Sequence, residues 1–335
     1  MLKAAIVKVV DGKNLTREEA SLAAGTIMRG EATPAQISAL LVALRIKGET
    51  IDEITGFAEQ MRAHSVHIHP HSKNLIDTCG TGGDVSHTFN ISTVSALVAA
   101  GAGAKVAKHG NRSVSSKCGS ADLLEAFGVK IDMAPEKVTE CIDKIGFGFM
   151  FAPSFHPAMK HAAPVRREIG VRTIFNILGP LTNPAGAKLQ ILGVYSPKLT
   201  EVMAEVLKNL GAERALVVHG MDGLDEISMS DKTKVSELKD GKISNYFIDP
   251  QELGIKKAEK GDLVVQNVED SKIAALEILE EHQKSPRLEI VALNAAAALY
   301  LSGLAKTIKA GIELAKESIN SGAAFRKLEE LRNVH

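Results

Sequence analysis

The chain has 335 residues, of which 45% are hydrophobic and 24% charged, and its mean hydropathy is close to zero. Forty basic residues balance forty acidic residues, so the chain lacks the positive field of a dedicated nucleic-acid-binding protein. No apolar run approaches the roughly 18 residues that a membrane-spanning helix needs. The length exceeds what one compact core usually holds, so we expect two lobes.

The start of the chain and its cysteines bear on where the protein works. A short apolar stretch near the N-terminus has charges on both sides and no small-residue cleavage site, which favours a cytoplasmic protein. Cys79, Cys118 and Cys141 form no CxxC pair, as is typical of a reducing compartment. Cys79 and Cys118 lie in segments rich in Gly and Ser, but neither belongs to a known nucleophile motif. We therefore interpret both as structural thiols.

The first seventy residues carry three signals for helix starts. Thr16, Thr33 and Thr50 each precede a Glu or Gln by three residues. This is the spacing of a capping box, in which both side chains pair with backbone N–H groups that the first helical turn leaves free. Apolar residues between positions 37 and 44 recur at helical spacing and mark a buried face. The sequence predicts a small helical domain over residues 1–72.

From residue 73 to residue 335, short apolar runs alternate with helical segments, and Ser120 and Ser196 each precede such a helix. The runs typical of buried strands cover residues 75–76, 104–107, 147–151, 189–194 and 215–218. This alternation predicts a large α/β domain with a mostly parallel sheet flanked by helices. Residues 230–248 predict a hairpin around Asp240-Gly241, and the last sixty residues return to helices. Residues 157–186 hold no strand-like run, and part of them can rejoin the helical domain.

A glycine-rich segment follows the first of these strands. Residues 77–84 read DTCGTGGD, and residues 88–93 read TFNIST at the start of an apolar helix. Glycines let the backbone approach a ligand closely, and a helix N-terminus favours negative charge. The segment predicts phosphate binding, and Ser92 could also reach a metal ion. A structural turn followed by a helix cap is the alternative interpretation.

A second polar segment, residues 108–120, reads KHGNRSVSSKCGS and lies between a predicted strand and a predicted helix. It holds three cations and four serines, and such a loop is costly to order without a polyanion that neutralises it. Open parallel sheets bind ligands at the carboxyl ends of their strands. We therefore predict a phosphate clamp that faces the first loop. A mobile basic surface loop is the alternative.

Two adjacent acids, Asp225 and Glu226, lie in the loop after the strand at 215–218. Carboxylates at the end of a strand are poor core residues, and their hard oxygens suit Mg²⁺, which usually also bridges to substrate phosphates. An acidic pair on a loop is more often a solvated turn. With two phosphate loops upstream, the pair is interpreted as the metal site, and it allows two ions per subunit.

Residues 156–184 combine arginines with small residues and one histidine before proline, His156. An arginine in such surroundings suits bidentate recognition of a carboxylate. Periodicity does not decide whether Arg166 or Arg167 faces inward. His156 could act as a general acid or base, but a capping or packing role is the more common one.

The motifs GTGGD, NIST, KHGNRSVSSKCGSADLLEAFG and RTIFNILGPLTNP together resemble those of the anthranilate phosphoribosyltransferase family of tryptophan biosynthesis, and the likeness covers essentially the whole chain. The resemblance implies a nucleoside-phosphorylase-like fold, a homodimer formed through the helical lobe, and Mg²⁺. It implies transfer of the phosphoribosyl group of phosphoribosyl pyrophosphate (PRPP) to the amine of anthranilate, with no nucleic acid or membrane as partner.

The resemblance also implies roles for single residues, and it assigns Arg166 rather than Arg167 to the acceptor. It implies that His156 lines the acceptor channel. The implied PRPP-binding residues are Gly80, Gly83, Asp84, Thr88, Asn90, Ile91, Ser92, Thr93, Lys108, His109, Gly110, Asn111, Arg112, Ser113, Val114, Ser115, Ser116 and Ser120. The implied anthranilate-binding residues are Gly80, Asn111 and Arg166, and the implied metal ligands are Ser92, Asp225 and Glu226.

An aromatic amine is neutral at pH 7, so no catalytic residue is assigned, and rate enhancement is expected from positioning and electrostatics. A pyrimidine nucleoside phosphorylase is the nearest rival, but it needs no pair of metal-binding acids. A non-enzymatic paralogue that binds nucleic acid is a second rival. It should show an excess of Lys and Arg and loss of the metal acids, and the sequence shows neither.

Overall fold

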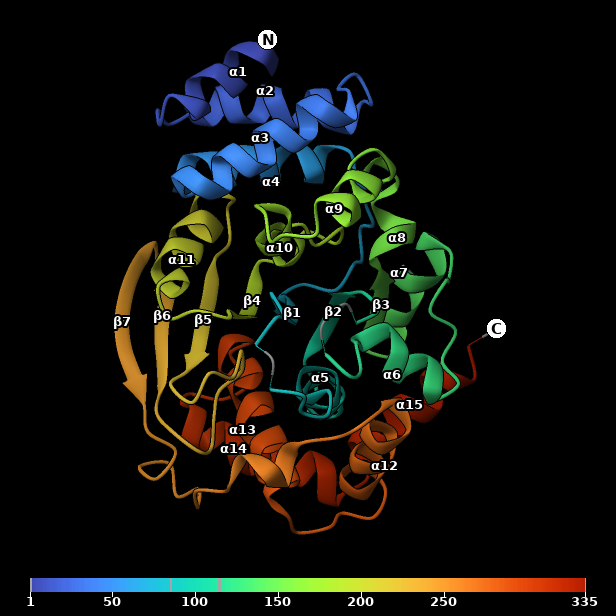
Figure 1. The fold of residues 1–335 in the computed structure, drawn as a ribbon. Coiled ribbons are helices and arrows are strands. Elements are labelled where there is room, and N and C mark those ends of the chain that lie inside the picture. Colours follow the sequence, from blue (N-terminus) through green and yellow to red (C-terminus); the bar gives the residue numbers. More distant parts are fainter. Residues whose placement is uncertain (1, 85, 114–115, 335) are drawn as a thin grey trace.

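The chain was analysed as a computed structural model that describes residues 2–84, 86–113 and 116–334. Its first four helices form a bundle at one end of the molecule (Figure 1). They are α1 (Leu2–Val10), α2 (Arg17–Met28), α3 (Pro34–Lys47) and α4 (Ile51–Ala63). Thr16, Thr33 and Thr50 each cap a helix through a complete capping box, which confirms the three predicted helix starts.

Glu53 of the third capping box is fully buried and holds three donors together. Its carboxylate accepts hydrogen bonds from the N–H groups of Leu15 at 2.9 Å and Thr50 at 2.8 Å, and from Lys47 Nζ at 2.9 Å. Substitution Glu53→Ala should lower the free energy of unfolding by about 3 kcal/mol, because two N–H groups lose their acceptor and Lys47 loses its anionic partner. Chemical denaturation tests this. Glu31→Ala removes an exposed pair with Arg29 and should change the free energy of unfolding far less than Glu53→Ala does. Equal losses would contradict the prediction.

The large domain is built on a seven-stranded sheet in the order β3-β2-β1-β4-β5-β6-β7 (Figure 1). Five strands are parallel, and β6 and β7 are antiparallel. The strands are β1 (Leu75–Gly80), β2 (Lys105–Gly110), β3 (Phe147–Phe151), β4 (Leu189–Gly193), β5 (Arg214–Gly220), β6 (Thr233–Lys239) and β7 (Lys242–Ile248). Asp240 and Gly241 join β6 to β7 with positive φ values of 51° and 72°, which confirms the predicted hairpin.

Three strands extend further into the polar segments than the sequence predicted. β1 runs to Gly80, β2 to Gly110 and β5 to Gly220, so Asp77 and Lys108 lie within strands and not in loops. Pairing of β1 with β4 continues from Ile76 to Gly80, and each polar side chain finds a buried partner inside the sheet. Apolar periodicity could not show this, because it depends on contacts between distant segments.

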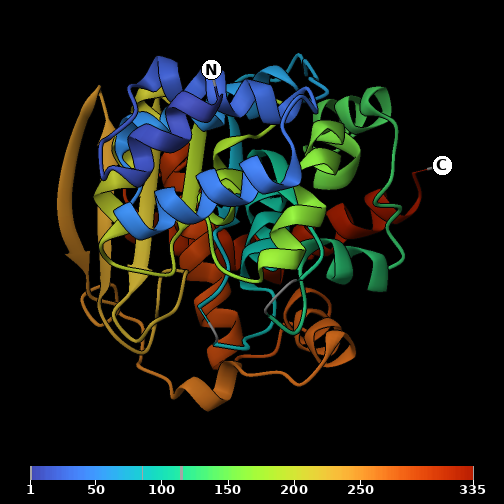
Figure 2. The ribbon, with the colours of Figure 1, turned by 45° about the horizontal axis from the view of Figure 1, so that its top comes forward.

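The two faces of the sheet belong to two different cores, as expected when side chains alternate along a strand. On β4, Ile191 faces one core and Leu192 the other. The first core joins the sheet to α5 (Ile91–Gly101), α12 (Val268–Leu279), α13 (Pro286–Leu301), α14 (Ile308–Asn320) and α15 (Ala323–Arg332). The second core joins it to α11 (Leu199–Asn209) and the N-terminal bundle (Figure 2). The last sixty residues are mainly helical, as predicted.

Two predicted helix starts need correction. α6 (Ser120–Ala126) has Gly119 as its cap, and Asp122 accepts the Gly119 N–H at 2.9 Å; Ser120 is already helical. α11 starts at Leu199 without a side-chain cap, later than the predicted signal at Ser196. The remaining helix of this region, α7 (Pro135–Lys144), leads into β3.

Residues 152–181 form short helices, and the structure shows no strand between β3 and β4. They are α8 (Ala152–Phe155), the 3₁₀ helix η1 (Pro157–His161), α9 (Ala163–Ile169), α10 (Phe175–Leu178) and the 3₁₀ helix η2 (Gly179–Leu181). Val165 and Phe175 belong to the same core as the N-terminal bundle. The boundary at residue 72 and the discontinuous helical lobe stay predictions. A further 3₁₀ helix, η3, covers Lys260–Leu263, and no helix in the described part of the chain is long and apolar enough to cross a membrane.

Candidate active site

The glycine loop after β1 is held against the loop that carries Asp225. Gly82 donates its N–H to Asp225 Oδ2 at 3.0 Å. A Cβ atom at Gly80 would lie 2.7 Å from the same oxygen, and one at Gly193 would lie 1.6 Å from the Asp225 carbonyl oxygen. Glycine at the ends of β1 and β4 therefore leaves the space in which the loop of Asp225 approaches the glycine loop.

The start of α5 brings the first and second loops together. Asn90 caps the helix, since its Oδ1 accepts the Thr93 N–H at 3.0 Å, and its Nδ2 donates to the Cys118 carbonyl at 3.0 Å. Lys108 is buried and reaches the Thr78 carbonyl oxygen and Ser92 Oγ, the latter at 3.3 Å. The predicted donor residues on β2 and α5 are thus tied to one another.

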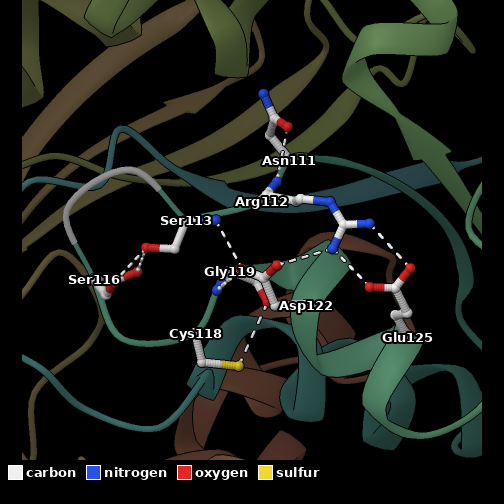
Figure 3. Close-up of polar contacts among 8 residues, drawn as sticks. All are labelled: Asn111, Arg112, Ser113, Ser116, Cys118, Gly119, Asp122 and Glu125. Atoms are coloured by element: carbon white, nitrogen blue, oxygen red, sulfur yellow. Dashed lines mark hydrogen bonds and ion pairs between the residues drawn. The ribbon is translucent and has the colours of Figure 1, made fainter. Parts of the chain in front are cut away.

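The carboxylate of Asp122 accepts hydrogen bonds from several residues of the second loop (Figure 3). Its Oδ2 accepts the N–H groups of Ser113 and Gly119, each at 2.9 Å, and its Oδ1 accepts from Arg112 Nη1 at 3.2 Å. Arg112 also forms a bidentate pair with Glu125 at 2.6 and 3.0 Å. One carboxylate therefore links the two ends of the loop.

These contacts correct part of the argument made for the second loop. The sequence suggested that three cations needed an external polyanion. In the structure, Arg112 is neutralised by Asp122 and Glu125, and Lys108 is buried within β2, where it donates to the Thr78 carbonyl oxygen. Acids from α6, which follow the loop in sequence, stabilise its order before any ligand binds.

Asp225 and Glu226, the predicted metal ligands, have raised pKa values in this structure. Burial and the neighbouring charge of Asp84 raise the pKa of Asp225 to about 7. Burial and the charge of Asp225 raise the pKa of Glu226 well above its usual value. Gathered carboxylates with such pKa values fit a divalent cation that would stabilise their charged forms.

The acids alone do not form a complete coordination sphere. No group of three or more His, Cys, Asp or Glu side chains is arranged to hold a metal in the part of the chain that the structure describes. Mg²⁺ usually binds through one or two carboxylates and completes its shell with water and substrate phosphates. The hydroxyl and carboxylate oxygens of Ser92, Asp225 and Glu226 are hard ligands of this kind.

Two buried histidines link the second loop to residues 156–184. The rings of His109 and His156 have centroids 4.9 Å apart. Both side chains are more than nine-tenths buried, and both Nε2 atoms are buried without a hydrogen-bond partner. Burial, with the neighbouring His156 next in importance, lowers the pKa of His109 to about 3. Burial lowers the pKa of His156 to about 4. Both imidazoles are therefore neutral at pH 7.

These pKa values predict how stability depends on pH. Between pH 6.5 and about 4, the two histidines bind protons in the unfolded chain but stay neutral in the folded one. The free energy of unfolding therefore falls as the pH falls. In the variant His109→Gln/His156→Gln, the slope of the free energy of unfolding against pH should be smaller by about 3 kcal/mol per pH unit. Denaturation measured at several pH values tests the prediction, with exposed His71→Gln as a control. An unchanged slope in the double variant would contradict it.

The structure distinguishes the two arginines of α9. Arg166 is half-buried, its guanidinium lies 5.4 Å from the centre of the Phe175 ring, and burial lowers its pKa. Arg167 is exposed. Arg166 is therefore the inward arginine, as the resemblance implied and periodicity could not decide.

The cysteines have the character of structural thiols. Burial raises the pKa of Cys79 well above its usual value, and it raises that of Cys118 to about 11. Cys141 is buried in the large core, and its pKa is also raised. A thiol with a raised pKa is a poor nucleophile at neutral pH.

Some predicted donor residues have less direct support. Val114 and Ser115 lie outside the described residues. The side chains of Ile91 and Thr93 are buried, so only their backbone remains for a ligand. Asn111 and Ser116 are exposed, and Ser120 is half-buried at the start of α6. Thr88 forms an isolated bridge with Val264.

Several contacts around the site were missed by sequence reasoning. Asn183 Nδ2 donates to Asp77 Oδ2 and to the Ala107 carbonyl, each at 2.8 Å. Arg172 Nη2 donates to the Gly83 carbonyl at 2.7 Å and stacks on Tyr195. Arg172 and Asn183 lie in the motif RTIFNILGPLTNP, but single-sequence patterns do not reveal their partners.

Two family models match the two parts of this architecture. The model described as "Glycosyl transferase family, a/b domain" matches residues 72–325, and "Glycosyl transferase family, helical bundle domain" matches residues 3–65. The fold and these two matches thus define a glycosyltransferase with a helical bundle and an α/β domain.

Similarity to individual proteins identifies the family within this class of glycosyltransferases. The anthranilate phosphoribosyltransferase of Acetivibrio thermocellus is 56% identical over 330 residues, 98% of this chain and 95% of that protein. The crystal structure of the Thermus thermophilus enzyme matches with a TM-score of 0.93 and 45% identity, covering 98% of both chains. The Saccharomyces cerevisiae enzyme in complex with PRPP and Mg matches with a TM-score of 0.92 and 28% identity over 99% of this chain and 97% of that one.

The chain belongs to the anthranilate phosphoribosyltransferase family and has the enzyme activity of that family. The fold and the reaction implied by the sequence resemblance are therefore confirmed. The phosphorylase and the nucleic-acid-binding paralogue do not account for identity above 50% over nearly the whole chain.

Proposed function

We propose that the loops around Gly80, Ser92 and Ser113 bind PRPP in this chain, and that Ser92, Asp225 and Glu226 hold Mg²⁺, two ions per subunit. The observation that carries the proposal is the contact between Gly82 and Asp225, which joins a phosphate-type loop to two acids with raised pKa values. The loop N–H groups and the start of α5 would orient the phosphates. When bound, Mg²⁺ would neutralise pyrophosphate and improve it as a leaving group.

We place anthranilate between the second loop and α9, with its carboxylate on Arg166. Arg166 is half-buried, and its guanidinium lies over the uncharged ring of Phe175, so a carboxylate would supply a counter-charge. Asn111 and Gly80 complete the predicted contacts. The unpartnered Nε2 atoms of His109 and His156 support a polar ligand beside them.

The reaction then needs positioning more than proton transfer. The neutral amine attacks the anomeric carbon of the ribose as the bond to pyrophosphate breaks, and the product amine releases its proton afterwards. The chain's contribution is to align the amine with that carbon and to stabilise the charge of the departing pyrophosphate through loop N–H groups. Both histidines are neutral, so neither supplies a positive charge.

The first test follows anthranilate fluorescence with purified protein and PRPP, with Mg²⁺ or with a chelator. A loss of fluorescence that requires both PRPP and Mg²⁺ supports the assignment. Turnover that is unchanged after metal removal would overturn the metal site while leaving the reaction in place.

We also propose a homodimer formed through the helical lobe, working in the cytoplasm. Large apolar side chains are exposed on the bundle at Val7 and Val10 of α1, Leu22 of α2 and Ile46 of α3, the last with 81% of its surface accessible. α1 packs beside α3, so these exposed side chains lie on neighbouring helices, and exposed apolar side chains that gather on one surface favour association. The thiol state of the three cysteines supports a reducing compartment.

The variant Val7→Asp/Ile46→Asp should convert a dimer into a monomer, because both charges would be buried in the interface. Light scattering after size-exclusion chromatography measures the mass. Phe247→Asp on the exposed edge strand β7 is the matched control and should remain dimeric. A double variant that keeps the wild-type mass would remove the helical lobe as the interface.

A further inference from the structure

Arg172 reaches the glycine loop from the segment between α9 and α10. Its Nη2 donates to the Gly83 carbonyl oxygen at 2.7 Å, and a Cβ atom at Gly83 would lie 2.8 Å from the same nitrogen. The guanidinium also lies over the Tyr195 ring, 4.7 Å from its centre. Stacking on an aromatic ring restricts the planar group before it forms the hydrogen bond.

Tyr195 holds the other side of the same loop. Its backbone N–H donates to Thr81 Oγ1 at 3.2 Å, and the Thr81 N–H donates to the Gly193 carbonyl at 2.9 Å. Gly82 is bound by Asp225. Three successive loop residues are therefore fixed by three different segments of the chain, and two of these contacts involve Arg172 or its stacking partner.

The backbone of Arg172 is anchored in the core of the helical bundle. The next two residues, Thr173 and Ile174, are buried. Phe175 packs edge-to-face on Phe57 of α4, with ring centres 6.2 Å apart. The guanidinium of Arg166 lies over the Phe175 ring, 5.4 Å from its centre. The segment 172–175 thus both contacts the glycine loop, through Arg172, and packs against Arg166, the predicted acceptor arginine.

We propose that Arg172 and Tyr195 form a positioning pair that holds the glycine loop in its PRPP-binding shape and ties that shape to the acceptor segment. This inference rests on the proposed PRPP site. The role proposed for Arg172 is to act through the Gly83 carbonyl, and not to bind a substrate itself. Its removal should weaken donor binding selectively, because the loop N–H groups would have to be ordered when PRPP binds.

The test compares Arg172→Ala, Arg172→Lys, Tyr195→Leu and Tyr195→Phe with the control Lys198→Ala, an exposed cation three residues beyond Tyr195. Calorimetric titration with PRPP and Mg²⁺, without acceptor, gives the donor Kd, and steady-state kinetics gives both KM values. Arg172→Ala should raise the donor Kd and KM about tenfold, the loss expected for one hydrogen bond from a charged donor. The KM for anthranilate should stay within about twofold at saturating PRPP.

The other variants separate the two contacts. Tyr195→Leu keeps the backbone contact with Thr81 but loses the ring, so it should weaken donor binding by about threefold. Tyr195→Phe and Lys198→Ala should match wild type, and Arg172→Lys should fall between wild type and Arg172→Ala. An unchanged donor Kd in Arg172→Ala, or a rise confined to the KM for anthranilate, would overturn the inference. If Asp225→Asn/Glu226→Gln also leaves the donor Kd unchanged, the proposed PRPP and metal site fails. If that double variant weakens donor binding and Arg172→Ala does not, only the role of Arg172 fails.

Discussion

The double variant Asp225→Asn/Glu226→Gln should lose turnover by about three orders of magnitude at ordinary Mg²⁺ concentrations, a loss typical when a transition-state charge loses its stabilising group. Both substitutions keep side-chain size and an oxygen acceptor but remove the charge that attracts the cation. The decrease should appear in kcat, measured by anthranilate fluorescence at saturating PRPP.

The same variant should remain folded and should be at least as stable as wild type. The raised pKa values of Asp225 and Glu226 mean that their charged forms are unfavourable in the metal-free fold at neutral pH, so neutral amides relieve that cost. Asp240→Asn in the exposed β6–β7 turn is the control, because asparagine tolerates a positive φ. Full activity in the double variant would remove the metal site from the proposal.

Arg166→Ala should raise the KM for anthranilate by about 30-fold or more and leave the KM for PRPP within a few-fold. Truncating one partner of a buried charge pair costs at least about 2 kcal/mol, and 1.4 kcal/mol corresponds to a factor of ten in affinity. The expected effect is confined to the acceptor because the recorded contact of Arg166 is with Phe175 on α10 and not with the glycine loop.

Arg167→Ala is the matched control, since Arg167 is the exposed neighbour on the same helix and should behave as wild type. Arg166→Lys should recover part of the acceptor affinity, because a lysine supplies charge without the bidentate fork. Equal increases in both KM values for Arg166→Ala would show that Arg166 supports the whole site and does not bind the acceptor carboxylate.

Local sequence determined the parts of this protein that depend on neighbouring residues. Thr16, Thr33 and Thr50 start helices because each capping box is complete within four residues. The turn at Asp240-Gly241 likewise needs only the two residues that accept positive φ. The long motifs indicated the family because they span both phosphate-type loops and the acceptor segment.

Tertiary structure decided what depends on residues far apart in the chain. Apolar periodicity ended β1 and β2 before Asp77 and Lys108, because it assigns polar residues to loops, whereas Asn183 and Thr78 provide the partners that allow both in strands. The sequence also overestimates the unpaired positive charge of the second loop, because the acids that neutralise Arg112 lie outside that loop. Arg112 and Glu125 are thirteen residues apart and meet only when α6 folds back beside the loop.

The sequence by itself determined the three capped helix starts of the N-terminal bundle, the fold class and the reaction family, since these follow from local patterns and long motifs. Only the tertiary structure decided that Arg166 and not Arg167 faces inward, and that Arg172 reaches Gly83 across 89 positions of sequence. The side to which a side chain points, and the distant residue that it contacts, depend on how helices and strands pack. A single sequence specifies both only through the whole fold.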